Sequence, residues 1–214
     1  MVKTNKTAEH LIKFIFPIAL GFSVFYLVGI LINESLSYKY WSLIGGYFFP
    51  PLGKESIIPI GIGLGIHPIV MALSIAFVDI VVALFLLWNY DFAKKIPFVG
   101  KFMIKVESKG KDFEKKYKWI KPLRFLGIVL FVIIPFQGSG GLVGSIVGRL
   151  VGMKPKNTFY AITIGAISGT LLIASFSHIF IELSKYNTIL TVILIAVIVL
   201  IIALYFIIKK IKKN

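Results

Sequence analysis

The chain contains no cysteine and only 9 acidic residues. The lack of cysteine excludes disulfides, thiolate metal sites and cysteine nucleophiles. Its 3 histidines are scattered and do not form a zinc site. The sequence also lacks a Walker loop, a nucleophile elbow and an HExxH motif, so ATPase and hydrolase chemistry are not expected. We therefore expect no enzyme activity, no cofactor and no metal.

Apolar residues dominate the composition. Of 214 residues, 57% are hydrophobic and 15% are charged, and the mean hydropathy is +0.90. A soluble domain of this length cannot hide so much apolar surface, which predicts a membrane protein. The net charge of +15 then fits lysines that set topology and contact anionic lipid heads. The expected partners are membrane lipids, and no nucleic-acid partner is expected.

Four apolar segments have the length of a membrane span, for which about 20 residues are needed. They are residues 11–32, 66–90, 157–181 and 188–208.

Two further apolar segments are interrupted: hairpin one (residues 41–65) and hairpin two (residues 123–152). The arms of each are too short to cross the bilayer alone. Broken backbone is tolerated at membrane depth where protein or a water-filled cavity surrounds it. Each segment is therefore interpreted as a re-entrant hairpin that enters and leaves on one side. The breaking residues are Pro50, Pro51 and Gly53 in hairpin one and Pro135 with the following glycines in hairpin two.

The distribution of basic residues predicts the topology. With a cytoplasmic N-terminus, the lysine-rich loop 91–122 and the basic tail 209–213 both lie inside, as the positive-inside rule favours. Loop 33–40 then lies outside, and the two hairpins enter from opposite faces. We expect a multi-pass protein of a prokaryotic plasma membrane with both termini cytoplasmic. The basic residues expected on the outer side are Lys39, Lys54 and Lys185.

The predicted fold is an all-α polytopic membrane protein with four transmembrane helices plus two opposed re-entrant hairpins. An offset of 85 residues aligns Pro50 with Pro135, Gly53 with Gly138 and Gly63 with Gly148, which suggests an inverted repeat. Transporters commonly place their site where such halves meet. The expected single integral membrane domain, 1–214, has five parts: first span and outer loop (1–40), hairpin one plus span (41–90), cytoplasmic basic loop (91–122), hairpin two plus span (123–181), and last span and basic tail (182–214).

The stretches "KESIIPIGIGLG" (54–65) and "IPFQGSGGLVGSIVGRLVGM" (134–153) resemble the small multidrug export protein family over roughly residues 40–160. That family is distantly similar to the DedA (SNARE-associated, VTT) membrane proteins, which are built from facing re-entrant hairpins and implicated in lipid movement. The resemblance implies a functional role for Glu55, which matches a glutamate of the first DedA hairpin. The DedA arginines that flank the proline of the second hairpin have no counterpart, because Val132 and Gly138 stand there.

Three ionisable residues are candidates for a substrate or proton pathway. Glu55 and Lys54 lie near the tip of hairpin one, and Asp79 lies near the middle of the span 66–90. Ionisable groups inside a membrane are costly and often mark such pathways. The structural alternatives are a helix cap for Glu55, snorkelling of Lys54 to the interface, and an interhelical hydrogen bond for Asp79.

The tip of hairpin two carries a polar, glycine-rich turn. Its backbone N–H groups and the start of the returning half-helix would suit an anion, whereas the alternative is a tight turn. Arg149 lies nearer the cytoplasmic interface, where it could bind a lipid headgroup, gate the cavity or snorkel. Glycines at 140, 144, 148 and 152 form a stripe on one helix face, which predicts close helix packing. The same stripe is compatible with a homodimer. The turn residues are Gln137, Gly138, Ser139, Gly140 and Gly141.

The leading functional hypothesis is a secondary transporter or lipid flippase that moves an anionic amphipathic substrate, such as a lipid-linked (polyprenyl) phosphate. Glu55, together with Asp79, would couple transport to protons. One alternative is an exporter of small hydrophobic cations, in which both carboxylates bind the substrate. Another is a membrane scaffold that acts through its basic cytoplasmic loop.

Overall fold

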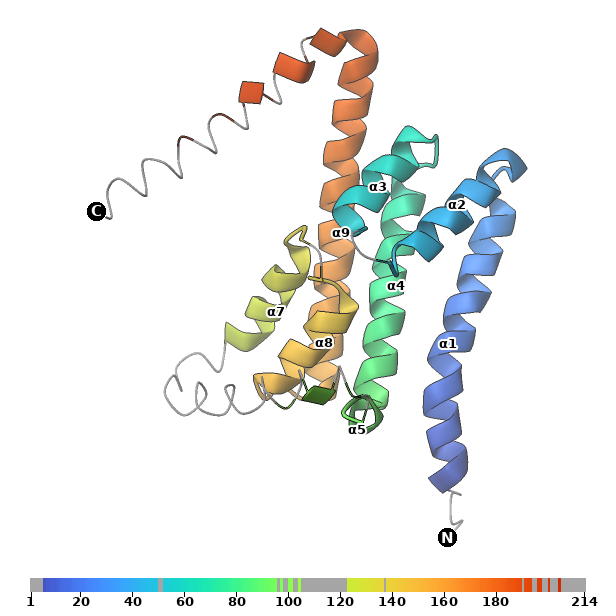
Figure 1. The fold of residues 1–214 in the computed structure, drawn as a ribbon, viewed down its shortest axis with the longest axis vertical. Coiled ribbons are helices and arrows are strands. Elements are labelled where there is room, and N and C mark those ends of the chain that lie inside the picture. The colour runs from blue at the N-terminus through green and yellow to red at the C-terminus, as the bar shows by residue number, and fades with distance from the viewer. Residues whose placement is uncertain are drawn as a thin grey trace. The chain divides into compact units, whose positions relative to one another are not determined.

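The structure is a computed structural model that describes most of the chain (Figure 1). Every regular element in the described part is a helix, which confirms the all-α prediction. The chain divides into two compact units, residues 1–174 and 175–214. The described residues are 6–49, 52–95, 97, 100, 101, 104, 123–136, 138–189, 191–193, 196, 197, 200 and 204. The helices are α1 (Lys6–Leu31), α2 (Glu34–Gly46), α3 (Lys54–Gly63), α4 (Pro68–Trp88), α5 (Tyr90–Ala93), α7 (Arg124–Ile133), α8 (Gly141–Leu150) and α9 (Pro155–Tyr186).

Three of the described helices are long and apolar enough to cross a membrane. They are Ala8–Leu31 within α1, Pro68–Trp88 and Pro155–Tyr186, and they correspond to the first three predicted spans. The fourth predicted span, 188–208, falls largely outside the described residues, as do most of the loop 91–122 and the basic tail.

The segment 33–40 differs from the expected outer loop, because α2 begins at Glu34. Asn33 is the N-cap of α2, and its backbone oxygen accepts hydrogen bonds from the N–H groups of Leu36 and Ser37. Glu34 in the first turn complements the positive end of the helix dipole. The polar composition of this segment therefore starts a helix rather than a loop.

Helices α1 and α4 pack side by side in the first unit (Figure 1). The rings of Phe14 and Phe85 meet edge-on with centroids 5.2 Å apart, and those of Phe25 and Phe77 with centroids 5.5 Å apart. The Asn89 amide donates to the backbone oxygen of Lys13 at 2.8 Å. Aromatic packing therefore joins the two helices along their length, and a hydrogen bond fixes them at one end.

Two pairs of short helices flank α4. The α2–α3 pair bends between residues 46 and 54, and the α7–α8 pair bends between 133 and 141. Both bends lie close to the middle of α4 (Figure 1), and residues from both line one cavity with Asp79. The helix breaks predicted for the two hairpins are thus present. Their entry into the membrane and return on the same side stays a prediction.

Helices α3 and α8 have the same length and the same ends. Each has 10 residues and follows an extended glycine N-cap, Gly53 or Gly140. Each is followed by a glycine with positive φ, Gly65 at 97° or Gly152 at 77°, which closes a Schellman-type end. The next helix begins at Pro68 in one case and Pro155 in the other, which defines an offset of 87 residues. The offset of 85 suggested by the sequence is therefore wrong for these elements, and the inverted relation stays a prediction.

Glycines allow α7, α8 and α9 to pack closely in the first unit. A Cβ added at Gly144 would lie 3.1 Å from the Val132 side chain, and one at Gly148 would lie 2.3 Å from Thr158. At Gly165, a Cβ would lie 2.8 Å from the backbone oxygen of Val129. The glycine stripe therefore serves helix packing, as predicted. Because it packs inside the unit, it gives no support to the predicted homodimer, which remains untested.

The second unit begins within α9, which continues to Tyr186. Lys185 and Glu182 form an exposed ion pair in its last turns, with 2.6 Å between nitrogen and oxygen. Phe176 and Ile179 are exposed apolar side chains on this part of the helix. Such a surface is expected where a helix faces lipid.

Candidate functional site

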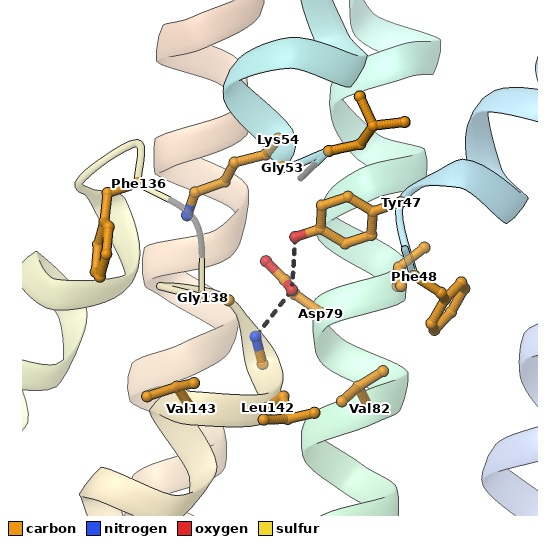
Figure 2. Close-up of a pocket in the computed structure, with 14 residues that line it drawn as sticks. Tyr47, Phe48, Gly53, Lys54, Asp79, Val82, Phe136, Gly138, Leu142 and Val143 are labelled. Carbon is orange, nitrogen blue, oxygen red and sulfur yellow. Dashed lines mark hydrogen bonds between the residues drawn. The ribbon is translucent and has the colours of Figure 1, made fainter. Parts of the chain in front are cut away.

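A cavity of about 240 Å³ lies where the bends of the two helix pairs meet α4 (Figure 2). Its wall combines Lys54, Asp79 and the hydroxyl group of Tyr47 with mainly apolar neighbours. The lining residues are Tyr47, Phe48, Leu52, Gly53, Lys54, Val78, Asp79, Val82, Phe136, Gly138, Gly140, Gly141, Leu142 and Val143.

Asp79 is held at the cavity wall by both helix pairs. It is the twelfth residue of the 21-residue helix α4 and is 3% exposed. The hydroxyl of Tyr47, at the end of α2, donates to its Oδ1 at 3.1 Å, and the backbone N–H of Gly141 donates to the same oxygen at 2.8 Å (Figure 2). The other oxygen, Oδ2, is buried and has no hydrogen-bond partner among the described residues. One oxygen of this carboxyl group is thus fully used, and the other is available.

Glycine is required at the start of α8 because the backbone there lies very close to Asp79. A Cβ at Gly141 would lie 1.9 Å from the backbone oxygen of Asp79, and one at Gly140 would lie 2.3 Å from Oδ1. Any other residue would push the start of α8 away from α4. Because the first N–H groups of a helix carry positive partial charge, this contact places a carboxyl group at a helix N-terminus.

Lys54 is the first residue of α3 and is 2% exposed. Its side chain reaches into the cavity (Figure 2), and its ammonium group donates a hydrogen bond to the backbone oxygen of Val132, in the last turn of α7. Carbonyl groups at a helix C-terminus lack helical partners, and the negative end of the dipole favours a cation there. The N–H of Phe136, which would be the helical partner of the Val132 carbonyl, donates to Ile134 instead. The lysine therefore caps α7 and does not snorkel away from the cavity.

Both buried charges are thus stabilised by the bend of the α7–α8 pair. The C-terminus of α7 faces Lys54, and the N-terminus of α8 faces Asp79. No ion pair joins these two side chains among the described residues. Burying two ions is costly unless each gains compensating hydrogen bonds. Here the two ends of one broken helix supply them, and the charges remain separate within one cavity.

Glu55 lies beside the cavity but does not line it. Its carboxyl group turns back over the start of its own helix, so that a Cβ at Gly53 would lie 2.3 Å from its Oε1. The atom Oε2 is buried without a hydrogen-bond partner among the described residues. This position resembles the capping alternative, although no side-chain cap hydrogen bond forms. A role in the proton pathway stays a prediction.

The turn before α8 is only partly an open binding loop. Gly138 has a φ of 88°, which favours glycine, and it lines the cavity. Ser139 is fully buried, and its hydroxyl donates to the backbone oxygen of Ile134 at 2.6 Å, so it braces the turn. The predicted site residue Gln137 and the predicted break residues Pro50 and Pro51 lie outside the described residues.

Arg149 is separate from the cavity. It lies in the last turn of α8, where its Nη1 donates to the backbone oxygen of Met153 at 3.1 Å. Its guanidinium carbon is 5.0 Å from the centre of the Tyr90 ring, a cation–π contact. The structure therefore brings together Lys54, Asp79 and the glycine turn, but not Arg149.

Tyr47 is the site residue that the sequence analysis missed. It follows α2 within the run "GGYFFPP", residues 45–51, in which it is the one aromatic side chain that can donate a hydrogen bond. A polar aromatic residue just before a helix break was the available signal. Its acceptor, Asp79, lies 32 residues away in the sequence, so the pairing itself could not be read.

The apolar helices define an α-helical membrane protein, whose mainly apolar cavity contains the buried side chains of Lys54 and Asp79. Within this class, the chain belongs to the family described as "Putative small multi-drug export protein", whose profile matches residues 56–173, more than half of the chain. The matched range contains Asp79 and the α7–α8 pair and begins just after Glu55. A search of curated proteins and a search of solved structures each found no match.

Proposed function

We propose that the protein is a proton-coupled secondary transporter that moves an amphipathic anion with a compact headgroup, such as a lipid-linked phosphate. The family description supports membrane export. The observation that carries the finer proposal is a buried lysine and a buried, partly unpartnered aspartate in one cavity.

Lys54 is the group that would bind the anionic headgroup. An ammonium group has three N–H donors, and one of them bonds to Val132. The remaining donors lie in a cavity with mainly apolar walls, where an ionic contact is stronger than in water. The same positive charge would repel a cationic substrate. This feature favours the anion hypothesis over export of hydrophobic cations.

Asp79 is the group that would carry the coupling proton. Its Oδ2 atom is buried and has no described partner, so a proton can add there without first displacing a hydrogen-bond donor. An ionised Asp79 repels an incoming anion, whereas a protonated one does not. Proton binding would therefore favour anion binding, which is the requirement for coupled movement.

The size of the cavity supports a headgroup as the bound part. Its volume of about 240 Å³ is below the roughly 300–1,000 Å³ of sites that enclose drug-sized ligands. Phe48, Phe136 and Leu142 line the cavity and are 58%, 55% and 52% exposed. These apolar side chains would let a hydrocarbon tail remain outside while the headgroup enters.

Proteoliposomes with an imposed pH gradient test the proposal. Dodecyl phosphate serves as the anionic probe and tetraphenylphosphonium as the cationic one. We expect gradient-driven movement of the phosphate. Lys54→Gln should lower it about 10- to 100-fold, since a hydrogen bond to a charged group contributes about 1.5–3 kcal/mol. Lys156→Gln, at an exposed lysine, is the matched control and should have no effect.

The carboxyl variants identify the proton carrier. Asp79→Asn should keep anion movement down its own gradient and lose the response to pH, whereas Glu55→Gln should retain that response. The opposite pattern would assign the proton to Glu55. Loss of phosphonium transport in Asp79→Asn, with phosphate never moved, would establish the cation exporter instead. If neither probe moves and neutralising the loop 91–122 abolishes function, the scaffold alternative holds.

A further inference from the structure

Two polar connections join the α2–α3 pair to the α7–α8 pair, and each depends on one of the two buried charges. The first runs from Tyr47 through Oδ1 of Asp79 to the N–H of Gly141. The second runs directly from Lys54 to the backbone oxygen of Val132. The two charged side chains, Asp79 and Lys54, line the cavity, so a ligand in it meets the charged group of each connection (Figure 2).

We propose that these connections are two latches, and that the proton and the anion each release one of them, so that the helix pairs separate only when both ligands are bound. This inference rests on the proposed function and adds to it the coupling step. Tyr47 is then a positioning residue, which links α2 to the proton-binding carboxyl group.

The proton would release the first latch. Hydrogen bonds accepted by a carboxylate are roughly twice as strong as those accepted by a neutral group, so protonation of Asp79 weakens its bonds to Tyr47 and Gly141 together. The titratable groups nearest this site are Tyr47, which follows α2, and Lys54 and Glu55 in α3. Helix α8 faces Asp79 with backbone and apolar side chains.

The anion would release the second latch. The ammonium group of Lys54 bonds to a neutral carbonyl group in this structure. A phosphate bears full negative charge and accepts stronger, charge-assisted hydrogen bonds. An anion bound by the remaining N–H donors of the lysine therefore draws the ammonium group away from Val132. Because either latch alone still holds the pairs together, a proton or an anion by itself does not open them, and uncoupled leakage is suppressed.

Distance measurements between spin labels test this mechanism. The chain contains no cysteine, so introduced pairs are the only thiols. Labels at Ile60 in α3 and Leu130 in α7, both exposed, report on separation of the helix pairs. Labels at Ile60 and Leu73, on the adjacent helices α3 and α4, form the control pair. Distances are recorded in nanodiscs at high and low pH, with and without dodecyl phosphate.

The expected result is a longer Ile60–Leu130 distance only at low pH with phosphate present, and an unchanged control distance. In Asp79→Asn, phosphate alone should be enough to separate the helix pairs. In Lys54→Gln, low pH alone should be enough. Tyr47→Phe removes one hydrogen bond of the first latch. With phosphate present, its helix pairs should therefore separate at a higher pH than those of the wild type. Tyr40→Phe is its matched control, because Tyr40 is a buried tyrosine of α2 that donates to Ser74 at 3.1 Å, away from Asp79.

Separation with one ligand alone in the wild type would overturn the two-latch mechanism, as would equal behaviour of Tyr47→Phe and Tyr40→Phe. Failure of the proposed function gives a different result. If pH and phosphate leave every distance unchanged and proteoliposomes move neither probe, the transport proposal itself fails. If phosphate is moved by the pH gradient but the distances follow only one ligand, transport stands and the latches do not.

Discussion

Replacing Gly141 by alanine tests whether the approach of α8 to α4 holds the site together. The new Cβ would lie 1.9 Å from the backbone oxygen of Asp79, whereas ordinary contacts begin at 3.4 Å. The two segments must therefore separate by about 1.5 Å. The hydrogen bond from Gly141 to Oδ1, 2.8 Å long in this structure, does not survive such a shift.

The expected cost follows from that lost bond. A hydrogen bond to a charged group contributes about 1.5–3 kcal/mol, and overpacking adds about 1–3 kcal/mol. We expect the free energy of unfolding in mixed micelles to fall by about 3 kcal/mol, which is roughly a hundredfold in the unfolding equilibrium. Gly127→Ala in α7 is the control, because its Cβ would meet no atom within 4 Å, so it should be neutral or slightly stabilising.

A second substitution separates the backbone contact from the side-chain contact. The Cβ of Gly140→Ala would lie 2.3 Å from the carboxyl oxygen of Asp79. Asp79→Ala removes that obstacle and should rescue part of the loss in Gly140→Ala, but it should not rescue Gly141→Ala, which collides with backbone. Stability of Gly141→Ala within 0.5 kcal/mol of the wild type would refute the reasoning.

Three further outcomes are expected from unfolding titrations. Gly138→Ala should cost about 1–2 kcal/mol, because its φ of 88° is unfavourable for any residue with a Cβ; an unchanged midpoint would contradict this. Gly148→Ala should destabilise by about 1–3 kcal/mol through its contact with the Thr158 methyl group. Thr158→Ser should relieve most of that loss in the double variant, and strict additivity of the two free-energy changes would exclude the contact. Asn89→Ala should cost about 1–2 kcal/mol, because its amide joins α4 to α1 by a hydrogen bond of 2.8 Å to Lys13. Faster proteolysis at the N-terminal end of α1 would show that this helix has loosened.

The helix breaks could be predicted from the sequence because they depend on local chemistry. Proline removes a hydrogen-bond donor, and glycine permits positive φ, so their clusters mark bends without knowledge of tertiary contacts. The central place of Asp79 also followed from counting along an apolar run. These features required only the length of a span and the properties of single residues.

Which of the two side chains, Lys54 or Glu55, faces the cavity could not be predicted in the same way. Neighbouring residues on a helix point about 100° apart, so the choice depends on how the helix is rotated. The structure turns Lys54 into the cavity and Glu55 back over Gly53. The stabilisation of Lys54 by the end of α7 joins residues 78 positions apart. No local pattern contains that information. The segment 33–40, expected as an outer loop from the topology, likewise contains the start of α2.

The shared 87-residue register of α3–α4 and α8–α9 places Ala166 at the position that corresponds to Asp79. The two helix pairs share this register, but only α4 has an acid at the corresponding position. The substitution Ala166→Asp would test whether α9 can hold a second proton-binding carboxyl group at the corresponding position.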